Sequence, residues 1–226
     1  MVEENYNQTM ARFVEACGRA GRSAEDVRLV AVSKTFPAES VEKAFALGHR
    51  LFGENYVQEL VEKQEILPKD IDWHFIGRLQ RNKVKYIIDK VVLIHSVDSV
   101  ALAKEISRQA GLKHVEAQVL LQVNLGEEES KAGFAKEELR AGLEEIAVLP
   151  GVHVNGLMTI GPYFEEPEDA RPMFRAMRAL REEAASWAVP GVEMRCLSMG
   201  MSHDFMVAIE EGADIVRVGS AIFGQR

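Results

Sequence analysis

The chain has 226 residues, of which 47% are hydrophobic and 27% are charged, and its formal net charge at pH 7 is −8. This composition indicates a folded globular protein with a substantial core and excludes an intrinsically disordered chain. The negative charge argues against a nucleic-acid backbone or an anionic membrane as the main partner, because both attract clustered lysine and arginine.

The sequence carries no pattern typical of export, membrane insertion or metal binding. Its start, Met1–Tyr6, is acidic and polar, and its longest apolar runs, such as Val91–Ile94, are too short for a membrane helix. Cys17 and Cys196 lie far apart, and the six histidines include no close pair at ligand spacing. We therefore expect a cytoplasmic protein without a membrane span and without a bound metal.

The predicted elements alternate between helices and short strands. A helix is expected first, over Tyr6–Ala20. Beyond it, apolar runs alternate with amphipathic helical stretches, which is typical of βα units around a parallel sheet. The eight predicted strands are Leu29–Ser33, Leu51–Gly53, Trp73–Ile76, Val91–Ile94, Ala117–Val123, Val152–Met158, Glu193–Leu197 and Ile215–Val218.

Signals at the helix ends support this alternation. Gly48 and Gly212 are placed to end helices. Asp98 is predicted to cap the helix Val100–Ala110, and Ser202 the short helix near the end of the chain. We predict an α/β fold, a single (β/α)8 TIM barrel domain over residues 1–226, with the extra N-terminal helix at its bottom or side. An open, doubly wound sheet is the alternative.

The first strand delivers a lysine to the rim of the predicted barrel. Functional groups of such barrels lie at the carboxyl ends of the strands, and Leu29–Ser33 is followed directly by Lys34. A desolvated barrel mouth disfavours the charged form of a lysine and so supplies the neutral amine that Schiff-base chemistry requires. A surface lysine whose amine reaches water is the alternative.

The loops after the seventh and eighth strands suit an anion. Ser198–Ser202 leads into a helix whose N–H groups and dipole favour negative charge. After the eighth strand, Gly219 permits close backbone approach and Ser220 adds a hydroxyl. Each loop alone is also compatible with ordinary turn chemistry. Together with Lys34 they predict a site for a phosphorylated aldehyde.

Several segments, in order, resemble one family. The chain is similar over nearly its whole length to the pyridoxal phosphate homeostasis proteins, barrel proteins related to the barrel half of alanine racemase. The segments that carry the resemblance are Ala31–Lys34, Phe52–Glu59, Trp73–Lys83, Glu129–Gly133, Gly156–Thr159, Leu197–Ser202 and Val216–Ser220.

The resemblance implies a barrel like that of the fold-type III pyridoxal 5′-phosphate (PLP) proteins, with PLP held as a Schiff base on Lys34. It implies no catalytic residue beyond this cofactor site. The other implied cofactor contacts are Ser198, Ser202, Gly219 and Ser220 around the phosphate, Met199 and Gly200 in the same turn, Arg217 facing the pyridine nitrogen, and Asn55, His74 and Met158 at the mouth. Which of Ser198 and Ser202 holds the phosphate stays open.

Arg217 has a mechanistic consequence. An arginine is always protonated and offers only donors, so it would bond an unprotonated ring nitrogen and leave the ring a weak electron sink. Racemisation also requires acid–base groups on opposite faces of the substrate. The related racemases take the second group from a tyrosine on another domain, whereas Tyr56 and Tyr163 here are better interpreted as half-buried packing residues.

We therefore predict a protein that binds, buffers and passes on PLP with little or no turnover. A PLP-dependent amino-acid racemase is the alternative, and a cofactor-free aldolase acting through Lys34 is a further one. The expected partners are PLP and PLP-dependent apoenzymes, and the expected state is a monomer.

Three charged segments receive separate predictions. The basic stretch Arg78–Lys85 is interpreted as a solvated helix face rather than a docking patch for an anion, and the acidic run Glu127–Glu129 as a solvated loop rather than a cation site. Lys131 is a hypothetical secondary amine that receives the aldehyde during handover, on the sole ground of its position after the fifth strand.

Overall fold

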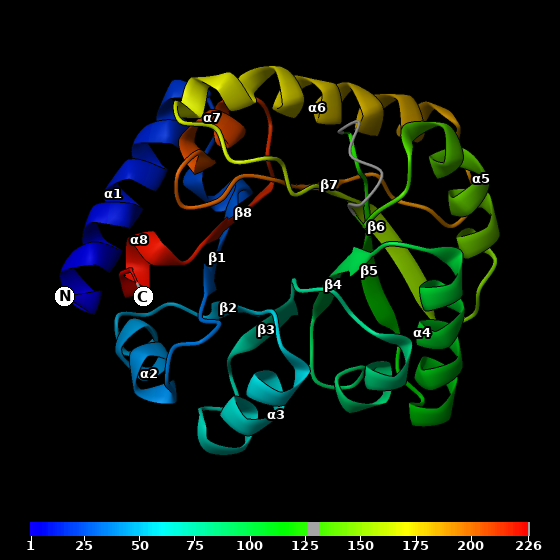
Figure 1. Ribbon diagram of the computed structural model, residues 1–226, viewed down its shortest axis with the longest axis horizontal. Helices are drawn as coiled ribbons and strands as arrows, with labels where there is room; N and C mark the ends of the chain where they lie inside the picture. The colour runs from blue at the N-terminus through cyan, green and yellow to red at the C-terminus, as the bar shows by residue number, and fades with distance from the viewer. Residues whose placement is uncertain (126–131, 226) are drawn as a thin grey trace.

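The computed structural model describes residues 1–125 and 132–225. Over these residues eight parallel strands form a closed barrel, in which each strand pairs with the next and β8 returns to pair with β1 (Figure 1). The strands are β1 (Arg28–Val32), β2 (Leu51–Glu54), β3 (Asp72–Phe75), β4 (Leu93–Val97), β5 (Ala117–Gln122), β6 (Val152–Met158), β7 (Cys196–Ser198) and β8 (Ile215–Val218). The predicted barrel is confirmed, and the open sheet is wrong.

Helices surround the barrel and connect its strands (Figure 1). The α-helices are α1 (Val2–Arg19), α2 (Ala38–Ala46), α3 (Val57–Ile66), α4 (Val100–Lys113), α5 (Lys136–Ala147), α6 (Arg171–Ser186), α7 (Phe205–Glu210) and α8 (Ser220–Phe223). Short 3₁₀-helices are η1 (Ala24–Asp26), η2 (Arg81–Tyr86) and η3 (Pro167–Ala170). Among the described helices, none is long and apolar enough to cross a membrane.

Apolar side chains fill both the barrel and the layer around it. A small interior cluster comprises Val30, Leu93, Leu120, Met158 and Ile215, all buried. A larger cluster packs the outer faces of the strands against the helices. The barrel is therefore a packed core and not a pore, and a ligand must bind among the loops at its carboxyl rim.

The extra N-terminal helix lies on the side of the barrel. Helix α1 packs against α2, α7 and α8 (Figure 1). Asn5 Nδ2 donates to the carbonyl of Ile222 at 3.3 Å, and Thr9 Oγ1 donates to that of Ala221 at 3.2 Å. The helix thus holds the segment that follows β8, which carries part of the rim.

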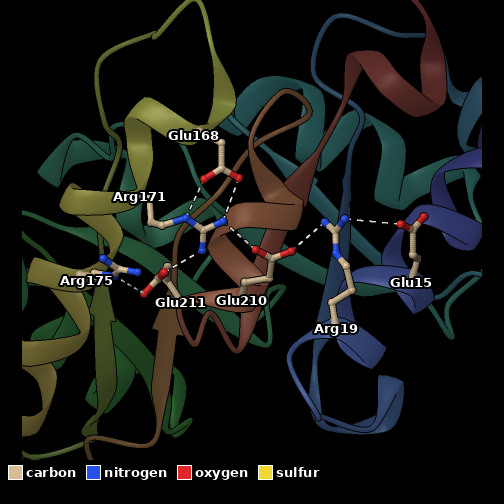
Figure 2. A network of polar contacts seen from close by, with 7 residues as sticks. All are labelled: Glu15, Arg19, Glu168, Arg171, Arg175, Glu210 and Glu211. Carbon is tan, nitrogen blue, oxygen red and sulfur yellow. Dashed lines mark hydrogen bonds and ion pairs between the residues drawn. The ribbon is translucent and has the colours of Figure 1, made fainter.

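A network of ion pairs ties α1, α6 and α7 together (Figure 2). Arg171 forms ion pairs of 2.7 Å with Glu168, Glu210 and Glu211. Glu210 also pairs with Arg19 of α1 at 2.7 Å. Because Glu210 and Glu211 stand at the carboxyl end of α7, this network fixes that end of the helix to α1 and α6.

Four local predictions are wrong. Strand β4 begins at Leu93, after the exposed Val92, and continues through buried polar residues that do not look like a strand interior in the sequence. Strand β7 covers only Cys196–Ser198. Ser99, and not Asp98, caps α4 by accepting from the Leu102 amide at 3.3 Å. The residue before α7 is Asp204, so Ser202 does not cap that helix.

Candidate functional site

A cavity of about 520 Å³ opens at the carboxyl ends of the strands, and residues far apart in sequence meet there. Lys34 follows β1, Asn55 follows β2, and Arg217 lies on β8. The predicted site residues that line this cavity are Lys34, Asn55, Ser202, Arg217, Gly219 and Ser220. The structure therefore brings Lys34, Arg217 and the loop residues Ser202, Gly219 and Ser220 together around one cavity.

The other predicted residues lie outside this lining. His74 and Met158, expected at the mouth, are buried: the His74 side chain bonds His95, and Met158 belongs to the interior apolar cluster. Both point into the barrel because their positions face inward on β3 and β6. Their placement at the mouth is therefore corrected.

The turn after β7 is also more buried than the sequence indicates. Met199 is fully buried in the outer core, and Gly200 accepts from the Arg217 amide through its carbonyl at 3.0 Å. Gly200 has φ +90°, and a Cβ there would lie 2.5 Å from the Cβ of Ala208. Packing and backbone conformation therefore account for this glycine.

Four side chains from four strands form a hydrogen-bonded row, the buried polar chain, beneath the cavity. Arg217 Nη1 donates to Ser198 Oγ at 2.5 Å, and its Nη2 donates to the Thr159 carbonyl at 2.8 Å. Ser198 Oγ lies 2.9 Å from His95 Nδ1, and His95 Nε2 lies 2.8 Å from His74 Nδ1. Arg217, Ser198, His95 and His74 are at most 4% exposed.

The hydrogen bonds of the buried polar chain are donated in one direction, from Arg217 towards His74. Since Ser198 accepts from Arg217, its own proton finds an acceptor if His95 Nδ1 is unprotonated. His95 then donates from Nε2 to His74 Nδ1, which fixes both tautomers. Burial lowers the pKa of His74 to about 3 and holds that of His95 well below its usual value. Both rings are therefore neutral at neutral pH.

Arg217 carries the positive charge of this row. Burial lowers its pKa to about 10, opposed by the nearby Asp204 carboxylate, so the guanidinium stays protonated at neutral pH. Two of its five N–H donors are engaged by the protein, and the side chain also lines the cavity. Donors of Arg217 can therefore serve a ligand with a lone pair.

The loops after β7 and β8 are joined at one hydroxyl. Ser202 Oγ accepts from the Gly219 amide at 2.9 Å and from the Ala221 amide at 3.4 Å. A Cβ on Gly219 would lie 3.1 Å from the carbonyl oxygen of Val32, so glycine lets this turn pack tightly on β1. Because the hydroxyl accepts both bonds, its proton can be donated into the cavity. Of the two candidate serines, Ser202 is the one that lines the cavity.

Sequence reasoning missed two buried polar groups. His95, the partner of His74, lies in an apolar strand, and Glu54 with Lys63 forms a buried ion pair at 2.6 Å. The signal for the histidines was a polar residue inside the predicted strand Trp73–Ile76 and another directly after the predicted strand Val91–Ile94. The signal for the ion pair was the spacing of four residues between Glu59 and Lys63, which is typical of paired charges on a helix, shortly after Glu54 at the end of an apolar run.

The remaining predicted segments have these positions. Arg81, Lys83 and Lys85 are exposed on η2, and this exposure is compatible with a solvated face and with a docking patch alike. Tyr163 lines the cavity and stacks on His203, but it is 76% exposed and not a half-buried packing residue. The described residues contain no cluster of His, Cys, Asp or Glu suited to a metal. The run Glu127–Glu129 and Lys131 lie outside the described residues.

Comparisons with known proteins agree on one family. The sequence model of the alanine racemase N-terminal domain matches residues 9–226. The pyridoxal phosphate homeostasis protein of Aquifex aeolicus is 49% identical over 224 residues, covering 99% of this chain and 97% of that protein. The protein of the same name from Pseudomonas aeruginosa is 42% identical and covers 100% of this chain and 96% of its own length.

Solved structures give the same result. PipY of Synechococcus elongatus, solved with PLP bound, is 40% identical with a TM-score of 0.81, covering 88% of this chain and 93% of PipY. Alanine racemase of Clostridium difficile is 16% identical with a TM-score of 0.78, and this likeness over 57% of that chain shows the fold alone. The chain belongs to the alanine racemase N-terminal domain family and, within it, to the pyridoxal phosphate homeostasis proteins.

Proposed function

We propose that this protein binds PLP through Lys34 and serves to buffer and deliver the cofactor. One observation carries the proposal: Lys34 shares a single cavity with Arg217 and with the turn formed by Ser202, Gly219 and Ser220. An amine, a donor for a ring nitrogen and a set of phosphate donors are the three groups that PLP requires. The names of the relatives and the bound PLP in the PipY structure support the same function.

The residues present fit the cofactor. The cavity volume of about 520 Å³ lies in the range of small-molecule sites. Asn55 Oδ1 is buried and has no hydrogen-bond partner among the described residues, although buried polar atoms are normally paired. A polar group of a ligand beside Asn55 would satisfy this atom.

Each cavity residue has a distinct task in this proposal. When bound, PLP supplies an aldehyde carbon that an amine can hold reversibly. Lys34 provides that amine from the end of β1. Arg217 donates to the ring nitrogen and, because it cannot give up its proton at neutral pH, leaves that nitrogen unprotonated. Ser202 and Ser220 donate to the phosphate, and Gly219 keeps the turn close enough for backbone contact.

The arrangement suits holding more than turnover. Arg217, in place of a carboxylate, makes the bound ring a weak electron sink and so disfavours carbanion chemistry. We propose that PLP-dependent apoenzymes receive the cofactor, and that the chain acts in the cytoplasm as a monomeric, single-domain carrier.

Amino-acid racemisation is the second candidate, and Tyr163 is the observation that favours it. A racemase requires a second acid–base group besides the lysine, and Tyr163 is the tyrosine that lines the cavity in the described part of the chain. Its high exposure leaves it in solvent, where nothing in the described structure orients its hydroxyl towards a substrate carbon.

A transfer assay separates the two candidates. Protein loaded with PLP and freed of excess cofactor is mixed with the apo form of a PLP-dependent enzyme, and the recovered activity is followed in time. The carrier function predicts reactivation, together with alanine racemisation far below about 1 per second. Absence of reactivation, or racemisation at about 1 per second or faster, would contradict it.

A further inference from the structure

The residues on both sides of Lys34 are held by side chains from β2 and α3. On the amino side, Ser33 Oγ donates to Glu54 Oε1 at 2.6 Å, and the Ser33 carbonyl accepts from Lys63 Nζ at 2.8 Å. On the carboxyl side, the Thr35 amide donates to Glu59 Oε2 at 2.7 Å. Lys63 and Glu59 therefore bond the two peptide groups that flank Lys34, and Glu54 bonds the side chain of Ser33.

Thr35 adopts a conformation that its side chain disfavours. Its φ is +65°, in the left-handed region, where a β-branched residue is an outlier. Such conformations persist only where the surroundings over-determine them, and they cluster at functional sites. The charge-assisted bond from the Thr35 amide to Glu59 is a local contact that can hold this turn.

Lys63 links the two carboxylates into one unit. Its ammonium donates to Glu54 Oε1 at 2.6 Å, to the Ser33 carbonyl at 2.8 Å and to Glu59 Oε2 at 3.3 Å. These three acceptors match its three protons. The Lys63 side chain is 7% exposed and that of Glu54 is fully buried, so this pair is shielded from water, whereas Glu59 is 27% exposed.

Stability alone does not explain why these charged side chains are buried together. Burial raises the pKa of Glu54, and Lys63 and Ser33 oppose this effect. Glu54 Oε2 has no hydrogen-bond partner among the described residues, which adds to the cost of burial. Apolar residues of similar volume are often as stable as a buried ion pair. Control of geometry beside a reactive lysine would provide such a reason.

We propose that Glu54, Glu59 and Lys63 are positioning residues that fix the Ser33–Thr35 backbone and thereby aim the Lys34 amine at the ligand in the cavity. This inference rests on the proposed function, because it concerns how Lys34 captures PLP. None of the three side chains lines the PLP cavity. Glu59 and Lys63 line an adjacent hollow with Thr35, and Phe36 borders both spaces.

The test separates aiming of the amine from binding of the ring and phosphate. Covalent capture of PLP is measured by stopped-flow absorbance, and non-covalent affinity is measured by calorimetry with pyridoxine 5′-phosphate, which lacks the aldehyde. Glu59→Ala is expected to slow capture on the order of tenfold or more, because small misplacements of a reacting group cost this much, while the analogue binds as in the wild type. Glu59→Gln keeps an oxygen for the Thr35 amide and is expected to restore most of the rate.

Glu62→Ala is the matched control. Glu62 lies on the same helix, and its carboxylate bonds exposed Gln58 at 2.9 Å, so capture should be unchanged. Thr35→Gly provides a second variant, since glycine accepts the left-handed conformation and the fold should persist while the turn loosens. It should also slow capture.

The outcomes distinguish the inference from the function on which it depends. Wild-type capture rates in both Glu59→Ala and Thr35→Gly, even with a lowered melting temperature, would show a merely structural role and overturn the inference. Equal losses of capture and of pyridoxine 5′-phosphate affinity would also overturn it. If the wild-type protein itself forms no borohydride-stable link to PLP at Lys34, the proposed function fails as well.

Discussion

Ser198→Ala tests the energetic role of the buried polar chain. The substitution removes one oxygen and leaves two buried partners, Arg217 Nη1 and His95 Nδ1, without the group they contact at 2.5 and 2.9 Å. A hydrogen bond to a charged group contributes about 1.5–3 kcal/mol and a neutral one about 0.5–1.5 kcal/mol. Water replaces the lost hydroxyl poorly, because both residues are at most 4% exposed. We expect a loss of about 2–4 kcal/mol in the free energy of unfolding.

Urea unfolding followed by tryptophan fluorescence measures this loss, since Trp73 is buried in the core. Ser186→Ala is the control: its hydroxyl bonds the Glu183 carbonyl at an exposed site, and the change should stay within about 0.5 kcal/mol. A loss below about 0.5 kcal/mol for Ser198→Ala as well would refute the reasoning, because the row would then contribute no net hydrogen-bond energy.

Three further predictions follow from the described contacts. The two histidines of the buried polar chain have pKa values below the unfolded value of about 6.5, so the stability of the neutral rings is complete above that pH and is lost as pH falls towards the folded values. Urea unfolding should therefore show a decline on the order of 1 kcal/mol per pH unit for each histidine below pH ~6.5, and a flat profile from pH 7 to pH 5 would contradict this. Arg171→Ala should lower stability by about 1 kcal/mol in a salt-sensitive way, whereas Arg178→Ala, which breaks one exposed pair, should not; equal melting temperatures would show that the network contributes nothing. Gly77→Ala places a Cβ 2.1 Å from the Asn55 carbonyl oxygen, so it should lower the free energy of unfolding by about 1–3 kcal/mol and displace Asn55, which would weaken PLP binding. An unchanged PLP affinity by titration would show that the position of Asn55 does not affect the site.

The barrel could be predicted because its signals are local. Apolar runs, glycines after helices and a lysine directly after the first strand each report on a few neighbouring residues. The end of strand β4 was misplaced because His95 and Ser96 are buried without being apolar. The apolar run therefore stopped at Ile94, whereas the strand continues to Val97. A polar residue facing the barrel interior looks the same in sequence as a residue facing water.

Several predicted site residues that follow strands line the cavity, whereas two of those within strands, His74 and Met158, do not. Lys34, Asn55 and Gly219 come at strand ends, and all reach the cavity. His74 and Met158 lie on strands, and their direction depends on barrel register, which no local pattern fixes. The Glu54–Lys63 pair needed knowledge of which helix face meets which strand, and that is a property of the folded chain.

The most direct test of the account is to locate the covalent contact with PLP. Purified protein is loaded with PLP, reduced with borohydride and digested, and the modified peptide is identified by mass, with Lys34→Ala treated in parallel. The account predicts one dominant label on Lys34, loss of the visible cofactor absorbance on reduction, and neither signal in the variant. A dominant label on another lysine, or an equal label in Lys34→Ala, would contradict it.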